Sequence, residues 1–328
     1  SFQSLFTMKT PMAGNGYDFG LSNKYTFLEK LKKKNFYLAS LQGSVFFSNF
    51  YDYPKKFHDY RLITNPYYII LTFQKHYLKN LNKTYLFKKI STKKYLTEMR
   101  FLLNKFFNKI NSSLKSNYFI SYPKSYKKFF QKRLETIHKN YLKNKDDFIL
   151  QNVNNLTWLN FFTPYGKLLS FLPDKLKSKI DHFFIQNFIL KKLQPSERDF
   201  SSNIIKFINK KKIKSQKKVF FWSHFLDPHD SIGGTNNFSK KNNFPINNSK
   251  QRYNYSLKSI DKTIFLLIKK IIQIDEFNNS IFIITSDHGP NLNQKIHITR
   301  NFNDNITHVP FFIYNKNLKP KVIGTTYQ

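Results

Sequence analysis

The run Ser280-Ile-Phe-Ile-Ile-Thr-Ser-Asp-His-Gly289 joins a short apolar segment to a carboxylate and an imidazole at its end. The segment from Ile281 to Ile284 is β-branched and aromatic, and turn-forming residues bound it on both sides, so it predicts a buried parallel strand. Ligands of open α/β sheets bind at the carboxyl ends of the strands. An Asp oxygen beside a neutral His nitrogen suits Zn²⁺ or Mn²⁺. Asp287 and His288 are therefore candidate metal ligands, although an isolated Asp-His pair is more often a helix cap beside a surface histidine.

Two upstream segments extend this pattern. Residues 253–272 carry apolar side chains at the spacing of an amphipathic helix that leads into the strand. Earlier, Lys217-Lys-Val-Phe-Phe-Trp-Ser-His-Phe-Leu226 predicts a second apolar strand, and Asp227-Pro-His-Asp230 follows it. If the two strands are parallel, their polar ends share one edge of the sheet. The sequence thus predicts an α/β fold in which His229 and Asp287 converge.

Taken in order, these motifs resemble the sulfatase branch of the alkaline phosphatase superfamily. The resemblance starts with Ser1-Phe-Gln-Ser-Leu-Phe-Thr-Met8 and with the helix and strand expected from Tyr25 to Gly43. It continues through Phe225-Leu-Asp-Pro-His229, the helix containing Asp261, Ser286-Asp-His-Gly289 and His308-Val-Pro-Phe-Phe-Ile313. Residues 60–216 show no motif of the family. The resemblance implies a three-layer α/β/α sandwich with a mostly parallel sheet.

The resemblance also implies roles for three residues. Asp287 and His288 correspond to metal ligands, and His229 corresponds to the histidine that contacts the sulfate or phosphate group being transferred. The implied cofactor is a divalent ion, Ca²⁺, Zn²⁺ or Mn²⁺. In this chemistry an activated alkoxide attacks sulfur or phosphorus, and water or an acceptor alcohol resolves the covalent intermediate. The family's nucleophile stands three residues before the position of Ser1. The resemblance therefore implies that Ser1 lies close to the same pocket and that the chain is an inactive fragment of a longer enzyme.

Departures from the family leave the substrate open. Gln42-Gly-Ser-Val-Phe46 stands where glycosulfatases have Gly-Lys-Trp-His, and the segment after Gly289 lacks the Glu-rich, Gly-rich sequence of phosphoethanolamine transferases. Three residues are candidate substitutes: His297 and His308 for catalysis or metal binding, and Arg300 for substrate binding. A lone histidine before Val-Pro-Phe is, however, more often strand-end packing.

The predicted function is a metal-dependent hydrolase of sulfate or phosphate esters, with a glycan or a lipid head group among the substrates considered. A phosphoglycerol or phosphoethanolamine-type transferase is the alternative within the superfamily. An inactive relative, or a basic protein that binds polyanions, is the alternative of another class. The resemblance alone suggests a periplasmic, extracellular or membrane-associated location, and no stretch of sequence has the length of a membrane anchor.

The middle of the chain is expected to differ from the rest. One α/β domain of residues 1–328, incomplete at its N-terminus and at its C-terminus, would contain a helical insertion at about residues 81–215. Leu81 to Lys115 and Ser125 to Lys145 are lysine-rich, with apolar residues three and four positions apart, which is typical of amphipathic helices. The alternative is a family core that has diverged beyond recognition.

The formal net charge of +36 favours a polyanionic partner such as nucleic acid. Only 6 of the 55 basic residues are arginines, however, and lysine lacks the planar fork that reads bases. Lys, Asn, Ile, Phe and Tyr have codons rich in A and T, so an AT-rich genome accounts for the excess. We therefore expect no specific nucleic-acid partner and lysines scattered over all exposed faces. The absence of cysteine excludes disulfides and thiolate metal sites.

Overall fold

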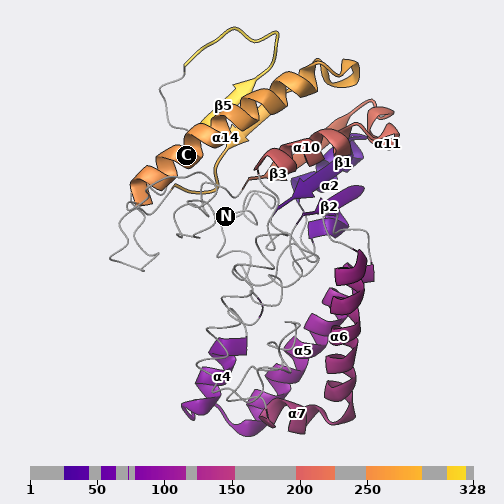
Figure 1. Ribbon diagram of the computed structural model, residues 1–328, viewed down its shortest axis with the longest axis vertical. Helices are drawn as coiled ribbons and strands as arrows, with labels where there is room; N and C mark the ends of the chain where they lie inside the picture. The colour runs from indigo at the N-terminus through magenta and orange to yellow at the C-terminus, as the bar shows by residue number, and fades with distance from the viewer. Residues whose placement is uncertain are drawn as a thin grey trace. The chain divides into compact units, whose positions relative to one another are not determined.

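The structure is a computed structural model of the chain, and its described part divides into two compact units (Figure 1). The first unit comprises Phe6–Ser196 and Gln216–Phe225, and the second comprises Ser1–Leu5, Glu197–Ser215 and Leu226–Gln328. The residues that the structure describes are 26–43, 53–63, 73, 78–115, 124–151, 197–225, 249–289 and 309–322.

A parallel three-stranded sheet lies in the first unit (Figure 1). Its strands are β1 (Tyr37–Gln42), β2 (Asp59–Leu62) and β3 (Val219–His224), in the order β2-β1-β3. β1 pairs with β3 from Tyr37 opposite Val219 to Gln42 opposite His224. All six residues of this central strand are buried. The predicted α/β class with a mostly parallel sheet is confirmed, and so is the apolar strand expected after Lys217.

The helix α2 (Phe27–Lys33) leads into β1, and side-chain hydrogen bonds fix its start. Thr26 and Glu29 form a capping box, in which the Thr26 N–H donates to Glu29 Oε2 over 2.8 Å. Lys56, in the 3₁₀ helix η4 (Tyr53–Lys56), forms an ion pair with Glu29 Oε1 at 2.7 Å. After the helix, Asn35 adopts a φ of 61°, a left-handed turn that Asn tolerates and that redirects the chain into the strand.

Aromatic rings pack against one face of β3. Phe220 and Trp222 are two residues apart, so their side chains lie on the same face of the strand. Phe27 of α2 meets Phe220 edge to face, with ring centroids 5.6 Å apart. Phe57, after η4, stacks on Trp222 at 6.1 Å. The helix α2 thereby contacts β3 as well as β1, the segment after η4 contacts β3, and η4 packs against β2.

Four helices of the first unit surround an aromatic core. Phe107 stacks on His138 with centroids 4.4 Å apart, and burial together with nearby Lys145 lowers the pKa of His138. Buried residues of α5 recur three and four positions apart, as amphipathic helices require. The helices predicted within residues 81–115 and 125–145 are confirmed, but the turn at residues 87–91 was not predicted. The helices are α4 (Lys79–Leu86), α5 (Thr92–Lys115), α6 (Lys124–Lys143) and α7 (Lys145–Gln151).

The second unit combines helices with a two-stranded ribbon. The long helix α14 (Ser249–Ile272) confirms the amphipathic helix predicted at residues 253–272, and it packs against α10. Ile260 and Leu267, two turns apart on one face of α14, are both buried. The other elements are α10 (Glu197–Ile208), α11 (Lys211–Lys214), the 3₁₀ helix η8 (Asp275–Phe277), β4 (Phe282–Thr285) and β5 (Phe311–Tyr314).

The pairing of β4 differs from the prediction. The strand is where the sequence placed it, but it pairs antiparallel with β5, Phe282 opposite Tyr314 and Thr285 opposite Phe311. Its residues alternate between half-buried and exposed instead of being buried. The prediction failed because a short apolar run gives the same sequence signal in a buried parallel strand and in an exposed ribbon. An equally apolar segment at Phe311–Tyr314 supplies the antiparallel partner.

Candidate functional site

The two predicted metal ligands lie just beyond the carboxyl end of β4. Asp287 Oδ2 and His288 Nε2 are 3.5 Å apart, and the two side chains are 20% and 52% exposed. The Ser286 hydroxyl donates a hydrogen bond of 2.7 Å to the carbonyl oxygen of His288, which tightens the turn after the strand. The turn therefore holds a carboxylate and an imidazole side by side and accessible to solvent.

The other ring nitrogen of His288 fixes its tautomer. Nδ1 lies 2.8 Å from the carbonyl oxygen of Gly289, and because a carbonyl only accepts, Nδ1 carries the proton. In the neutral imidazole this leaves the lone pair on Nε2, the nitrogen closer to Asp287. A hydrogen bond of this kind orients the histidine ligands of metal sites. His288 thus presents Nε2 next to the carboxylate of Asp287.

This pair fits one small divalent cation. Two ligands at about 2.1 Å from Zn²⁺ and at the tetrahedral angle are about 3.4 Å apart. The observed separation of 3.5 Å is close to that value. A structural zinc site needs four ligands and a catalytic site usually three. Within the described ranges, no cluster of three or more His, Cys, Asp or Glu residues could hold a metal ion. The described residues thus supply two candidate ligands, Asp287 and His288.

The remaining predicted site residues lie outside the described residues. They are His229, His297, Arg300 and His308, and Ser1 lies outside as well. The convergence of His229 with Asp287 therefore stays a prediction. The strands that lead to these two residues belong to different sheets, because β3 pairs with β1 whereas β4 pairs with β5.

Gln42 begins the segment that departs from the Gly-Lys-Trp-His pattern, and it is an internal residue of the sheet. Its side chain is fully buried at the end of β1. The amide Nε2 donates to Ser40 Oγ at 2.8 Å and to the Trp222 carbonyl oxygen at 3.1 Å, which ties β1 to β3. Its Oε1 is buried and finds no hydrogen-bond partner among the groups that the structure describes. Gln42 therefore stabilises the carboxyl edge of the sheet and does not present a cation to a substrate.

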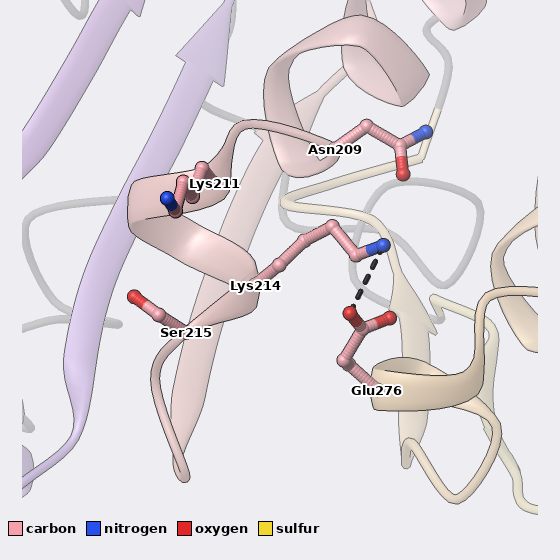
Figure 2. A pocket seen from close by; sticks show the side chains of 5 residues that line it. All are labelled: Asn209, Lys211, Lys214, Ser215 and Glu276. Atoms are coloured by element: carbon pink, nitrogen blue, oxygen red, sulfur yellow. Dashed lines mark ion pairs between the residues drawn. The ribbon is translucent and has the colours of Figure 1, made fainter.

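Figure 2 shows a surface hollow in the second unit that was not predicted from the sequence. Its volume is about 390 Å³, and the Lys214 side chain extends from α11 toward Glu276 of η8, with Nζ and Oε1 2.9 Å apart. The hydrogen bond from Lys214 lowers the pKa of the Glu276 carboxyl. The lysine-rich residues 210–214 are recognisable in the sequence, but the partner of Lys214, Glu276, is too distant in the sequence for the pair to be predicted. Because Glu276 neutralises Lys214, we assign no chemistry to this hollow. Asn209, Lys211 and Ser215 complete its lining.

The parallel sheet and the packed helices define the class as a mixed α/β protein. The family model described as Sulfatase matches residues 150–328, more than half of the chain. The chain belongs to the sulfatase family, and so to the alkaline phosphatase superfamily of hydrolases and transferases. Neither the comparison with curated proteins nor that with solved structures gave a match.

The matched range contains every predicted site residue. It also contains residues 150–216, which carry no motif recognised from the sequence. The segments Ser1–Met8 and Tyr25–Gly43, proposed to resemble the family, lie outside it. The family generally uses a divalent metal and acts on sulfate or phosphate esters. Among the described helices, none has the length and apolar character needed to cross a membrane.

Proposed function

We propose that the protein is a metal-dependent hydrolase of sulfate or phosphate esters in which Asp287 and His288 bind a divalent cation. The observation that carries this proposal is the geometry of the pair, an oxygen and a nitrogen 3.5 Å apart directly after a strand. The Nδ1–H of His288 is held by the Gly289 carbonyl, which favours Nε2 as the ligand atom. Both residues lie within the range matched by the sulfatase family.

The proposed roles follow from the chemistry of each group. The cation, when bound, lowers the pKa of the attacking group and offsets negative charge on the ester oxygens. Asp287 supplies an anionic oxygen ligand, and His288 supplies Nε2. His229 donates a hydrogen bond to an oxygen of the transferred group, as the corresponding histidine of the family does. Turnover proceeds through a covalent ester on the nucleophile, which water resolves.

Substitution of the ligands tests this proposal. In the intact gene product, Asp287→Ala and His288→Ala should each lower turnover of nitrophenyl sulfate or nitrophenyl phosphate by a factor of at least about one hundred. The reason is that losing a ligand removes several kcal/mol of transition-state stabilisation. Dialysis against a chelator should abolish activity, and refilling with Zn²⁺, Mn²⁺ or Ca²⁺ in turn identifies the metal that restores it.

The matched control is Asp275→Ala, which removes an exposed carboxylate of η8 upstream of β4. This variant should keep wild-type turnover and metal content. Unchanged turnover in Asp287→Ala or His288→Ala, with normal circular dichroism, would show that the pair is structural. Release of free sulfate or phosphate equal to that of nitrophenol identifies hydrolysis. A transferase is identified, and the hydrolase assignment contradicted, if turnover requires added glycerol and releases almost no free anion; partial diversion to glycerol is expected of any covalent ester intermediate.

A further inference from the structure

The turn between α4 and α5 exposes apolar side chains at its tip. Leu86 is 49% exposed and Phe87 is 72% exposed. The next two residues, Lys88 and Lys89, are exposed as well. We call residues 83–94 the α4–α5 tip. Side chains this exposed contribute little hydrophobic stabilisation to the fold, so the tip is a candidate contact surface.

The backbone of the tip is held in a defined conformation. The Lys88 N–H donates to the Tyr85 carbonyl at 2.8 Å, and the Lys89 N–H donates to the Thr84 carbonyl at 3.0 Å. These two bonds form a Schellman motif, whose left-handed position is usually glycine. Here that position is Lys88, with a φ of 54°. Lys88 therefore places a cationic side chain at a position where glycine is usual.

Side-chain contacts between the two helices support the tip from below. The rings of Tyr85 and Tyr95 stack with centroids 4.2 Å apart. The Tyr95 hydroxyl donates to Asn82 Oδ1 over 2.8 Å inside the protein. Ser91 caps α5, because its Oγ accepts the Lys94 N–H at 3.3 Å. The tip is therefore presented by a rigid helical hairpin.

The charge of the tip has one sign. Five lysines lie within residues 83–94, and the sequence has no acidic residue between Asp59 and Glu98. None of the five makes an ion pair within the part of the chain that the structure describes. Two of them occupy the first turn of α5, where the helix dipole disfavours cations and favours anions. The five are Lys83, Lys88, Lys89, Lys93 and Lys94, and all are exposed.

We propose that the α4–α5 tip binds an anionic membrane surface, with Leu86 and Phe87 in the acyl boundary and the lysines at the level of the lipid phosphates. An apolar pair flanked by flexible lysines is the arrangement of interfacial anchors. Lysine is a compact point charge that a phosphate layer attracts without a fixed geometry. A soluble polyanion would use the lysines but would leave Leu86 and Phe87 in water. The exposed apolar pair therefore favours the lipid surface.

Because the chain has no cysteine, a single introduced thiol can report insertion of the tip. Phe87→Cys labelled with an environment-sensitive dye should shift its emission to the blue when vesicles of phosphatidylcholine with 30% phosphatidylglycerol are added. Phe101→Cys is the matched control, because Phe101 is 62% exposed on the same helix pair. It lies nine residues beyond the start of α5, about 14 Å along the axis, beyond the roughly 5–10 Å depth of interfacial burial. Its emission should stay unchanged.

Co-sedimentation with the same vesicles tests the apolar and the cationic contributions to binding separately. Phe87→Ser should weaken binding about tenfold, and Lys88→Gln with Lys89→Gln should weaken it by on the order of fivefold for each charge removed. Phe101→Ser, and Lys139→Gln with Lys143→Gln on α6, should bind as the wild type does. The proposal is wrong if Phe87→Ser binds normally, if binding is equal on pure phosphatidylcholine, or if labelled residue 87 responds to heparin as it does to vesicles.

Discussion

The strands β1 and β5 show that burial of a strand depends on its place in the sheet more than on its own residues. β5 reads Phe-Phe-Ile-Tyr, and all four residues are exposed. β1 reads Tyr-Leu-Ala-Ser-Leu-Gln, which is less apolar, and all six residues are buried. β1 has a parallel neighbour on each side, whereas β5 has one antiparallel partner among the described strands. Hydrophobicity alone therefore does not show which of the two strands forms a core.

Polar residues are accommodated in β1 because the sheet supplies partners. Ser40 Oγ donates to the Trp222 carbonyl oxygen at 2.9 Å, and Ser223 Oγ donates to the Leu41 carbonyl oxygen at 2.7 Å. A buried hydroxyl without a partner would cost roughly 1–3 kcal/mol. Neighbouring strands therefore make a buried position tolerable for serine. In the ribbon of β4 and β5, by contrast, apolar side chains remain in contact with solvent. Phe311, for example, is 64% exposed.

The largest expected effect tests this comparison directly. Leu38→Ala in β1 removes a side chain that is fully buried, and it should lower the free energy of unfolding by about 2–5 kcal/mol. Ile283→Ala in β4 removes a side chain that is 61% exposed, and it should cost less than about 1 kcal/mol. Urea unfolding, followed by tryptophan fluorescence and by circular dichroism, measures both values.

The two probes also show whether the units unfold together. The chain has two tryptophans, Trp158 and Trp222, so the fluorescence is measured in a Trp158→Phe background. There Trp222, in β3, reports on the parallel sheet, whereas circular dichroism reports on all helices. An Ile283→Ala variant that loses as much stability as Leu38→Ala would break the comparison. Such a result would mean that a further surface covers the β4–β5 ribbon in solution.

The sequence predicted individual elements better than their pairing. The helix α14 was predictable because its apolar residues repeat with helical spacing, and β3 and β4 were predictable because they are short apolar runs between polar segments. The antiparallel pairing of β4 with Phe311–Tyr314 was not predictable, since pairing depends on contacts between residues far apart in the chain. The turn at Lys88 was hidden because the residue with positive φ is not a glycine.

For the candidate site, residue types were predictable and their arrangement was not. Asp287 and His288 could be identified as candidates because an adjacent Asp and His at the end of a strand stand out in the sequence. The hydrogen bond from His288 to the Gly289 carbonyl depends on the backbone of the turn. The burial of Gln42 depends on its neighbours β2 and β3. Neither feature leaves a pattern in the local sequence.

Each unit contains a glutamate–lysine ion pair, and the pair in the first unit is expected to have an effect of intermediate size on stability. Burial alone would raise the pKa of Glu29, but hydrogen bonds from Lys56 and Thr26 outweigh it and hold that pKa below 4.5. Glu29→Gln removes the charge from the capping box of α2 and should cost about 1 kcal/mol of unfolding free energy at pH 7. Urea unfolding of the variant and the wild type at pH 7 measures this difference.

The sign of the pH dependence follows from the lowered pKa. The carboxylate of Glu29 contributes its full stability above the unfolded-state pKa of about 4.5, and the contribution disappears as pH falls through the lower folded-state pKa. The difference between wild type and Glu29→Gln should therefore shrink between pH 5 and pH 3. A difference that stays constant over this interval would show that Glu29 acts through packing and not through its charge.

The smallest effect is expected at the second pair, Glu276 with Lys214. The hydrogen bond from Lys214 lowers the pKa of Glu276, so any stability it adds is present above the normal pKa and is lost on acidification. Because both side chains are substantially exposed, at 40% and 33%, water and salt screen their attraction. Glu276→Gln should leave the Tm at pH 7 unchanged within error, in low and in high salt, as should the partner variant Lys214→Gln. A loss of Tm as large as that of Glu29→Gln, in either variant, would mean that the hollow around Lys214 is closed to solvent. The contrast between the half-buried Glu29–Lys56 pair and the more exposed Glu276–Lys214 pair would then fail.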